Sequence, residues 1–410
     1  MLKDHCIVCF APDPWDDLWR NRHRLLSIFS RQNRVLYVEP RSSVRTLLRR
    51  LRAGELKLRD FLRRRVEEVR ENLFVYHDPI HLPRTSRHSL GALVDGLRFS
   101  MLRRTLRHLR MERPILWIVR PDGFDVPGRL GEKAVLYQVV DDYLTYAGIT
   151  ERGRARLDRE ERSLAARADL VVVTSEHLLE AKKHLSANMV LVPNGVDERT
   201  IEEGRSPRGP VPPDLANARR PICGYLGGIT EKLDFDLLEK VAAKLGTSGG
   251  GTLVFVGSTR IYGKEAVDLV ARLRSMPNVV FTGRKEAEQV PAYLRAFDVC
   301  LIPYRPGKQA EAIDPLKLYE YLAFGKPTVS VDIPSVRRFA EVVRIARDPE
   351  EFLTHLDSAI DERDEATGER RRALARENSW ESRAEEISAA VERVLEARLT
   401  GGRPELPRLR

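Results

Sequence analysis

The sequence has 410 residues, of which 42% are hydrophobic and 32% charged, and it carries a net charge of +10. That length exceeds what one hydrophobic core usually supports, so we expect two domains, and the apolar content excludes a disordered chain. No apolar run approaches the ~20 residues that span a bilayer, and residues 1–4 lead directly into a strand-like segment, which argues against a signal peptide. We therefore expect a cytoplasmic protein whose surplus of basic residues attracts anionic partners.

The first half of the chain alternates short apolar, β-branched runs with helical segments. The runs predict strands at 6–10, 35–38, 73–76, 115–119, 135–140, 170–174 and 190–192. Strands that alternate with helices predict a parallel sheet covered by helices on both faces. The cysteines fall inside such runs, as small core residues do in a reducing compartment, and we predict no metal site from them. They are Cys6, Cys9, Cys223 and Cys300.

Residues 44–66 interrupt this alternation with a strongly basic segment whose apolar residues recur at helical spacing. A basic amphipathic helix can lie on an anionic membrane surface, and we expect this contact for the segment. The alternative is an arm that packs leucines such as Leu47 and Leu51 on the first domain, with Gly54 dividing it into two short helices. A nucleic-acid partner is not expected, because the segment has no aromatic platform and the chain no recognised binding module.

The second half repeats the alternation after a Pro-rich, non-periodic stretch at 201–220, which we interpret as a linker. Domains at 1–200 and 221–379 follow, the second with strands at 222–226, 253–256, 279–282, 299–303, 328–331 and 343–346. An amphipathic helix at 380–399 and a tail at 400–410 complete the chain. Two doubly wound sheets in tandem bind ligands in a cleft between the carboxyl ends of their strands.

Glycines follow the predicted strands of the second domain. Gly227 and Gly228 end the first of these strands before a helix that starts near Asp234, a pattern typical of phosphate binding by backbone amides. Further strands end in Gly257-Ser258 and Gly283-Arg284. Asp234 and Asp236 form a D-x-D pair that could hold a metal, but at a helix start we favour capping of free amides.

Several motifs spread over nearly the whole chain are similar to those of one enzyme family. They are Lys-Leu-Tyr-Glu-Tyr-Leu-Ala-Phe-Gly-Lys-Pro at 317–327, Glu161-x-x-Leu164, Val173-Thr174-Ser175, Val192-Pro193-Asn194-Gly195-Val196-Asp197 and Ser379-Trp380-Glu381. The sequence resembles the retaining GT-B glycosyltransferases of family 4, the "group 1" transferases. The resemblance implies an α/β protein with two doubly wound Rossmann-like domains, an interdomain cleft and a C-terminal helix.

The resemblance also implies roles for individual residues. Glu320 matches the last Glu of the family's E-x7-E motif, which bonds the donor ribose, while Ala312 takes the place of the first Glu and Glu311 or Asp314 is its candidate substitute. Lys232 lies near the family's diphosphate-binding Lys, although a solvated helix start is an equal alternative. The family's Arg position falls on Gly227 or Gly228, so we consider Lys317, Arg305 and Lys308 as sources of its charge.

The strand ends and the family resemblance together give the residues that we expect in the site. We expect donor contacts from Gly227, Gly228, Gly257, Ser258, Arg284, Tyr304, Asp314, Pro315, Leu316, Lys317 and Glu320. Asp142, Lys232, Lys317 and Glu320 are the candidate catalytic residues. Trp15, Asp16, Asp141 and Asp142 are the candidate acceptor-side residues, with caps and packing at loop ends as the alternative.

The expected activity is transfer of a sugar from a nucleotide-diphosphate sugar to a glycan or lipid-linked acceptor, with retention and without a metal or other cofactor. The resemblance places this reaction in cell-envelope or exopolysaccharide synthesis, and the basic segment places it at the inner face of a membrane. The alternatives are a sugar-nucleotide epimerase or phosphorylase of the same fold, or a GT-B binding protein without catalysis.

Overall fold

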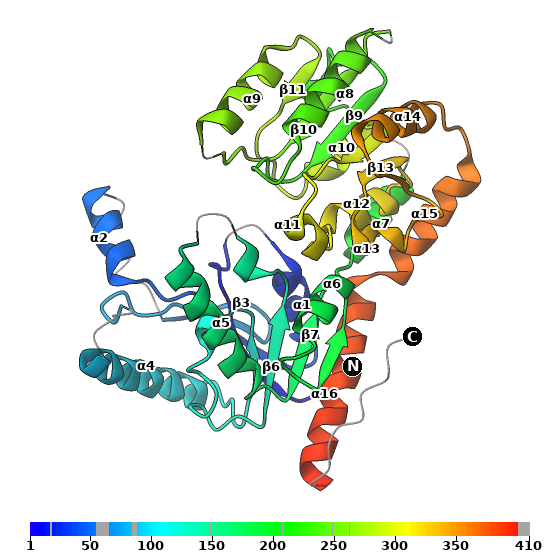
Figure 1. Cartoon of the computed structure of the whole chain (residues 1–410). Coiled ribbons are helices and arrows are strands. Elements are labelled where there is room, and N and C mark those ends of the chain that lie inside the picture. The colour runs from blue at the N-terminus through cyan, green and yellow to red at the C-terminus, as the bar shows by residue number, and fades with distance from the viewer. Residues whose placement is uncertain are drawn as a thin grey trace. The chain divides into compact units, whose positions relative to one another are not determined.

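The computed structural model describes residues 1–16, 19–54, 65–83, 88–146, 149–206, 209–247, 249–261 and 263–400, and Figure 1 shows its elements. The chain divides into two compact units. Unit 1 comprises Met1–Thr174, Leu178–Val192 and the chain from Arg383 onward, and unit 2 comprises Ser175–His177 and Pro193–Ser382.

Unit 1 is built on an eight-stranded sheet in the order β3-β4-β2-β1-β5-β6-β7-β8. The strands are β1 (Cys6–Phe10), β2 (Arg34–Val38), β3 (Val66–Arg70), β4 (Leu73–Tyr76), β5 (Ile115–Ile118), β6 (Ala134–Val139), β7 (Leu170–Val173) and β8 (Met189–Leu191). All neighbouring pairs are parallel except β3 and β4. The seven strands predicted here from apolar runs are confirmed, because parallel strands covered on both faces are apolar throughout.

Strand β3 is the one that the sequence did not predict. It reads Val-Glu-Glu-Val-Arg, pairs antiparallel with β4 and carries a register shift between Glu68 and Arg70. Its glutamates are exposed, as is typical of an edge strand that must not pair with another chain. A half-charged edge strand lacks the apolar run on which the prediction relied.

The helices of the first part of the chain connect these strands. They are α1 (Asn21–Phe29), α2 (Val44–Arg52), α4 (His88–His108), α5 (Glu151–Ala165) and α6 (Glu176–Lys182), with single turns η1 (Pro121–Gly123) and η2 (Tyr143–Thr145). The helix predicted within 44–66 is confirmed as α2, and residues 55–64 of that segment lie outside the described residues. Leu48 and Leu51 on α2 are exposed, so the predicted alternative of an arm packed on the first domain is wrong for Leu51.

Unit 2 contains a six-stranded, all-parallel sheet in the order β11-β10-β9-β12-β13-β14. The strands are β9 (Ile222–Leu226), β10 (Thr252–Val256), β11 (Val279–Phe281), β12 (Val299–Ile302), β13 (Thr328–Val331) and β14 (Arg344–Ala346). The helices of this unit are α7 (Glu198–Arg205), α8 (Phe235–Thr247), α9 (Lys264–Ser275), α10 (Val290–Ala296), α11 (Lys308–Ala312), α12 (Leu316–Ala323), α13 (Pro334–Arg337), α14 (Pro349–Ile360) and α15 (Glu365–Glu377). Helix α16 (Trp380–Thr400) begins in unit 2 and belongs to unit 1 from Arg383 onward. The six strands expected here are all present, and they carry the core of the unit.

The predicted linker at 201–220 is part of unit 2 instead. Helix α7 packs on α12 and α15, and a Cβ at Gly204 would lie 2.1 Å from the carbonyl oxygen of Ala323, so only glycine allows this close packing. Leu215 is buried in the core. The chain passes between the units after Val192 and again after Ser382, at the start of α16. Pro213 begins the short turn η3 (Pro213–Leu215) within this folded unit.

Candidate functional site

Three strand ends of unit 2 meet through their glycines. The Gly227 amide donates to the Val256 carbonyl at 2.9 Å, and the Gly257 amide donates to the Gly283 carbonyl at 3.0 Å. A Cβ at Gly257, whose φ is +151°, would lie 2.0 Å from the Gly227 carbonyl oxygen. A side chain at 257 cannot fit, so the sequence keeps glycine where the backbones of β9 and β10 converge.

The other predicted residues at these strand ends have more space around them or are more exposed to solvent. The Ile229 amide donates to the carbonyl of Ser258 at 3.0 Å, which holds the two loops together. Gly228 has open space around its Cβ position, with Thr230 Cγ2 nearest at 3.9 Å. Ser258 is half-buried and Arg284 is exposed. The structure therefore brings the predicted glycines, Ser258 and Arg284 to one edge of the unit 2 sheet.

Lys317, near the start of α12, reaches to the glycine at the end of β9. Its side chain is buried, and Nζ donates a hydrogen bond of 2.6 Å to the hydroxyl of Tyr304. Nζ also lies 4.6 Å from the ring centroid of Tyr225, and a Cβ at Gly227 would lie 3.2 Å from Lys317 Cε. The rings of Tyr225 and Tyr304 and the Tyr304 hydroxyl thus hold the Lys317 ammonium group beside the glycine loop, Gly227-Gly228.

Lys232 adds a second charge to the same place. Its Nζ lies 5.2 Å from the ring centroid of Tyr304, and its carbonyl accepts a 2.8 Å hydrogen bond from the Arg305 amide. Burial raises the pKa of the Tyr304 phenol, but the charges and hydrogen bonds of Lys232 and Lys317 together lower that pKa to about 8. Burial also lowers the pKa of Lys317. Two cations around one phenol concentrate positive charge that suits a phosphate group.

Glu320 lies one turn after Lys317 on α12, so the two residues share one side of the helix. Glu320 is half-buried, and its charge raises the pKa of Lys317 in part. The Leu226 amide donates to the Tyr321 hydroxyl at 2.9 Å, which ties α12 to the end of β9. Pro315 caps α12 and Leu316 is its first residue. The helix therefore carries the Lys-x-x-Glu pair to the glycine loop, as the sequence predicts.

Asp314 is a predicted donor contact whose side chain is held by other residues of unit 2. The side chain is fully enclosed, and its carboxylate accepts hydrogen bonds from the Asn194 amide at 2.7 Å and from the Tyr319 hydroxyl at 2.8 Å. Arg338 Nη2 lies 3.1 Å from the same carboxylate. Asp314 therefore anchors the loop before α12 to Asn194, and its contact with the donor stays a prediction. Glu311, the other candidate substitute, is exposed.

Asp234 is the N-terminal cap of α8, as the capping interpretation predicts. Its Oδ1 accepts a hydrogen bond of 3.0 Å from the Leu237 amide. Within the described ranges, no group of three or more His, Cys, Asp or Glu side chains is arranged to hold a metal ion.

Asp142, a predicted catalytic and acceptor-side residue of unit 1, belongs to a network of charged side chains. Lys182 Nζ lies 3.1 Å from Asp142 Oδ1 and 2.8 Å from Glu161 Oε2, and both Lys182 and Glu161 are buried. Asp141 accepts a hydrogen bond from the Tyr146 hydroxyl. The sequence analysis missed Lys182, although its spacing of four from Leu178 on α6 is the signal of a residue on the buried helix face.

Trp15, a predicted acceptor-side residue, is buried. Its ring packs edge-on against Tyr37 with centroids 5.1 Å apart and lies 5.2 Å from His23. The Trp15 amide donates to Glu39 Oε1 at 3.1 Å. Asp16 next to it is exposed. Trp15 thus fits the packing alternative considered for loop ends, and Asp16 remains available to solvent.

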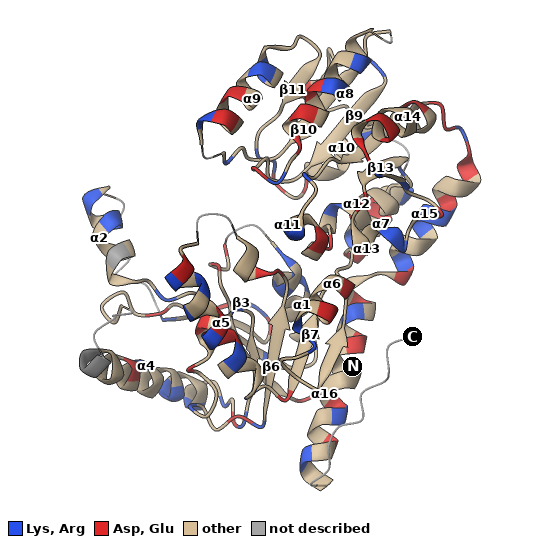
Figure 2. Cartoon of the chain, in the orientation of Figure 1, with Lys and Arg blue, Asp and Glu red and all other residues tan. Residues whose placement is uncertain are grey.

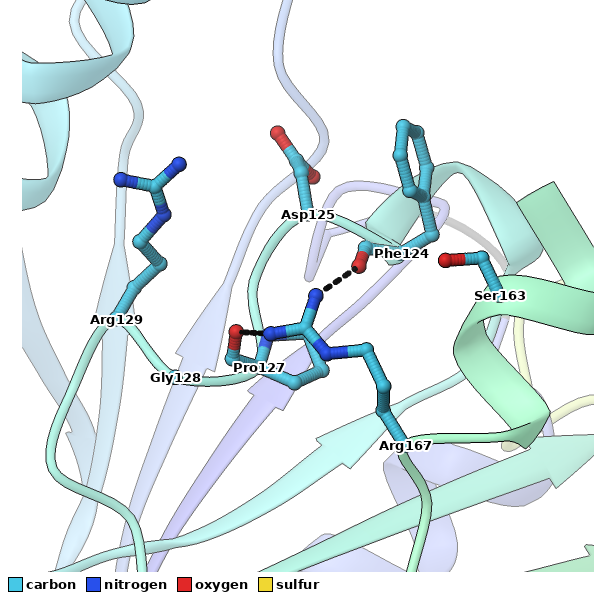
Figure 3. Close-up of a pocket in the computed structure, with 7 residues that line it drawn as sticks. All are labelled: Phe124, Asp125, Pro127, Gly128, Arg129, Ser163 and Arg167. Atoms are coloured by element: carbon cyan, nitrogen blue, oxygen red, sulfur yellow. Dashed lines mark hydrogen bonds between the residues drawn. The ribbon is translucent and has the colours of Figure 1, made fainter.

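A separate cavity of about 480 Å³ opens on unit 1 between the loop after η1 and α5 (Figure 3). Arg167 lies in it, and its guanidinium donates to the carbonyl of Phe124 at 3.1 Å and to that of Pro127. Ser163 and Gly128 also line this cavity. None of the predicted site residues lines it, and its arginine holds the loop in place through two carbonyl groups.

Comparison with known proteins shows which proteins the chain is similar to. Residues 220–362, which contain the glycine loop, Lys317 and Glu320, match the family described as Glycosyl transferases group 1. Over 399 residues, the chain is 27% identical to the putative teichuronic acid biosynthesis glycosyltransferase TuaH of Bacillus subtilis, covering 92% of this chain and 94% of that protein.

Solved structures share the fold over almost the whole length. Sucrose-phosphate synthase from Thermosynechococcus elongatus superimposes with a TM-score of 0.69 at 16% identity, covering 96% of this chain and 100% of that one. HepE of Anabaena, in a complex with UDP-glucose, superimposes with a TM-score of 0.64 at 13% identity, covering 94% and 99%. The predicted fold class, two doubly wound domains of the GT-B type, is confirmed.

Proposed function

We propose that this chain, whose residues 220–362 match the group 1 glycosyl transferases, is a glycosyltransferase that moves a sugar from a nucleotide-diphosphate sugar to an envelope glycan or lipid-linked acceptor. Unit 2 would hold the donor and unit 1 the acceptor. The anomeric configuration is retained in this proposal, which follows the resemblance to retaining enzymes.

One observation carries the donor assignment. The charges of Lys317 and Lys232 meet at Tyr304 beside Gly227, inside the part of the chain that matches the family. A leaving nucleoside diphosphate develops negative charge as the glycosidic bond breaks, and preorganised cations stabilise that charge. Lys317 and Lys232 take this role in the proposal, with no metal ion or other cofactor, and Glu320 accepts hydrogen bonds from the ribose hydroxyls. The UDP-glucose complex of HepE supports a nucleotide-sugar donor.

The acceptor and the place of the reaction come from other observations. The relative TuaH is named for teichuronic acid biosynthesis, which supports a role in polysaccharide synthesis for the envelope. No helix in the described part of the chain is long and apolar enough to cross a bilayer. We place the enzyme in the cytoplasm, attached peripherally to the inner membrane face where lipid-linked acceptors are exposed.

The test is incubation of the full chain with a panel of nucleotide sugars, with and without a lipid-linked glycan acceptor, in buffer with and without excess EDTA. Nucleoside diphosphate release that requires acceptor and persists in EDTA supports the proposal. An NMR time course of the first product reports its anomeric configuration, and an inverted product contradicts retention.

The same assay separates the alternative functions. An epimerase converts the donor sugar without acceptor and releases no nucleoside diphosphate. A binding protein without catalysis shifts in thermal stability with a nucleotide sugar but yields no product. A ligand at about a hundredfold over its dissociation constant stabilises by ~2.7 kcal/mol, which a thermal-shift screen detects.

A further inference from the structure

Two helices of unit 1 expose an unusual share of the large apolar side chains. Five of the nine exposed large hydrophobic residues in the described part of the chain lie on α2 and α4, with exposed fractions between 40% and 64%. They are Val44, Leu48, Leu51, Leu93 and Leu97. Soluble proteins rarely leave such residues grouped on neighbouring elements unless the surface has a partner.

Helix α2 combines an apolar face with a basic one. Val44, Leu48 and Leu51 follow each other at spacings of four and three, which places them on one side of the helix. The last turn carries Arg49 and Arg52 beside this face, and the helix has no acidic residue. Figure 2 shows α2 without any red segment. A helix of this kind buries its leucines at the headgroup boundary and keeps its arginines among lipid phosphates.

Helix α4 also exposes apolar side chains. Leu93 and Leu97 are four residues apart and so lie on one side of α4. Asp95, between them in sequence, pairs with Arg41, which precedes the cap of α2 by two residues. This ion pair ties the start of α2 to α4, and both helices lie along the same edge of unit 1 (Figure 1). Further along α4, Arg104 is exposed.

The charges decide which partner fits. The exposed arginines favour an anionic surface, whereas a second copy of the chain docked on the same face would bring arginines together. Asp95 is already paired with Arg41, and α2 itself has no acidic residue. We propose that α2 and α4 together form a docking surface for an anionic lipid bilayer. This proposal deepens the proposed function, since it would bring the acceptor-binding unit to a lipid-linked acceptor.

The experiment measures co-sedimentation of the full chain with phosphatidylglycerol-containing and pure phosphatidylcholine vesicles at low and high salt. The double variants Leu48→Ser/Leu51→Ser and Leu93→Ser/Leu97→Ser are each expected to weaken binding to anionic vesicles by about tenfold or more, because they remove apolar side chains that would be buried. Arg49→Gln/Arg50→Gln/Arg52→Gln is expected to weaken binding roughly a hundredfold and to flatten its salt dependence.

The matched control is Val267→Ser, because Val267 on α9 of unit 2 is exposed by 48% and lies on neither helix. Its binding should equal that of the original chain. Equal binding to both vesicle types, unchanged binding of the Leu93→Ser/Leu97→Ser variant, or no binding at all would each overturn the two-helix surface. Dimers in sedimentation velocity that the leucine variants dissociate would assign the face to a second copy instead.

A separate readout keeps this proposal distinct from the proposed function. Transfer to a water-soluble acceptor analogue should be unchanged in the leucine variants, which also shows that they fold. If the original chain transfers no sugar to any acceptor but still binds anionic vesicles through both helices, the proposed function fails and the docking surface stands. If it transfers sugar without binding vesicles, the docking surface fails alone.

Discussion

The Nζ of Lys317 lies 2.6 Å from the phenol oxygen of Tyr304, in a buried place where Lys232 supplies a second positive charge. A phenol between two ammonium groups ionises more readily than one in water, because its anion is the partner that both cations attract. Ionisation of Tyr304 therefore makes the net charge of the proposed diphosphate site depend on pH.

We predict that Tyr304 ionises near pH 8, two units below its ordinary pKa of 10.0. Because the pKa in the folded state lies below that in the unfolded state, ionisation stabilises the fold above pH 10, and this stabilisation is lost as the pH falls through about 8. Donor affinity should fall as the pH rises through 8, since the phenolate neutralises the lysine charges. Absorbance of tyrosinate against pH should show this transition in the original chain and not in Tyr304→Phe.

The control for that titration is Tyr137→Phe, because the pKa of Tyr137 is raised well above its ordinary value by burial and by Glu161. This variant should keep the absorbance change near pH 8. Donor affinity that stays constant between pH 7 and 9, measured by calorimetry, would contradict the role of the Tyr304–Lys317 pair in holding the diphosphate.

Glu320→Ala is expected to weaken donor binding by ~1.5–3 kcal/mol, about ten- to a hundredfold, because ribose hydroxyls lose a charged acceptor. Calorimetry with the nucleotide sugar measures this loss directly. Glu369→Ala is the matched control, since Glu369 is exposed on α15 of the same unit and belongs to no candidate site. Equal donor affinities of the two variants would show that Glu320 does not contact the ribose.

The sequence predicted the strands of unit 2 and the glycines that follow them, for a physical reason. Buried parallel strands such as β9 and β12 are continuous apolar runs, and the residues that follow them meet at one edge. Gly227 and Gly257 were proposed by that rule, and Lys317 was proposed from the family resemblance. No local pattern shows, however, that Asp314 is enclosed, because its partner Asn194 lies 120 residues away in the sequence.

The same limit applies to unit 1. Trp15 follows a strand end, as a ligand-binding residue would, but its ring is covered by Tyr37 of the neighbouring strand β2 and by His23 of α1. Strand β3 forms only because β4 offers it an edge. Contacts between elements distant in sequence decided these positions, and one sequence does not show them.

Gly257→Ala should destabilise the chain by more than about 2 kcal/mol and abolish donor binding, because its Cβ would lie 2.0 Å from the Gly227 carbonyl oxygen and its φ of +151° strains an L-residue. Gly228→Ala tests the alternative that any added methyl in this loop is harmful. Its Cβ meets open space, so its unfolding free energy should stay within about 0.5 kcal/mol of the original. Urea denaturation of both variants measures the difference, and equal stabilities would show that the β9 and β10 ends are not closely packed.

Lys182→Met should destabilise unit 1 by about 3–5 kcal/mol, because it leaves the carboxylates of Glu161 and Asp142 enclosed without their cation. Although burial lowers the pKa of Lys182, these carboxylates raise it above its ordinary value of 10.5, so the stabilisation is complete at neutral pH and is lost only as the pH rises past that value.

Urea unfolding followed by tryptophan fluorescence reports mainly on unit 1, which holds Trp117 in its core. The neighbouring Lys183 has a side chain that is 67% exposed, so Lys183→Met should cost less than about 1 kcal/mol despite its ion pair with Glu180. Similar losses for the two variants would mean that the buried network contributes no more than a surface ion pair.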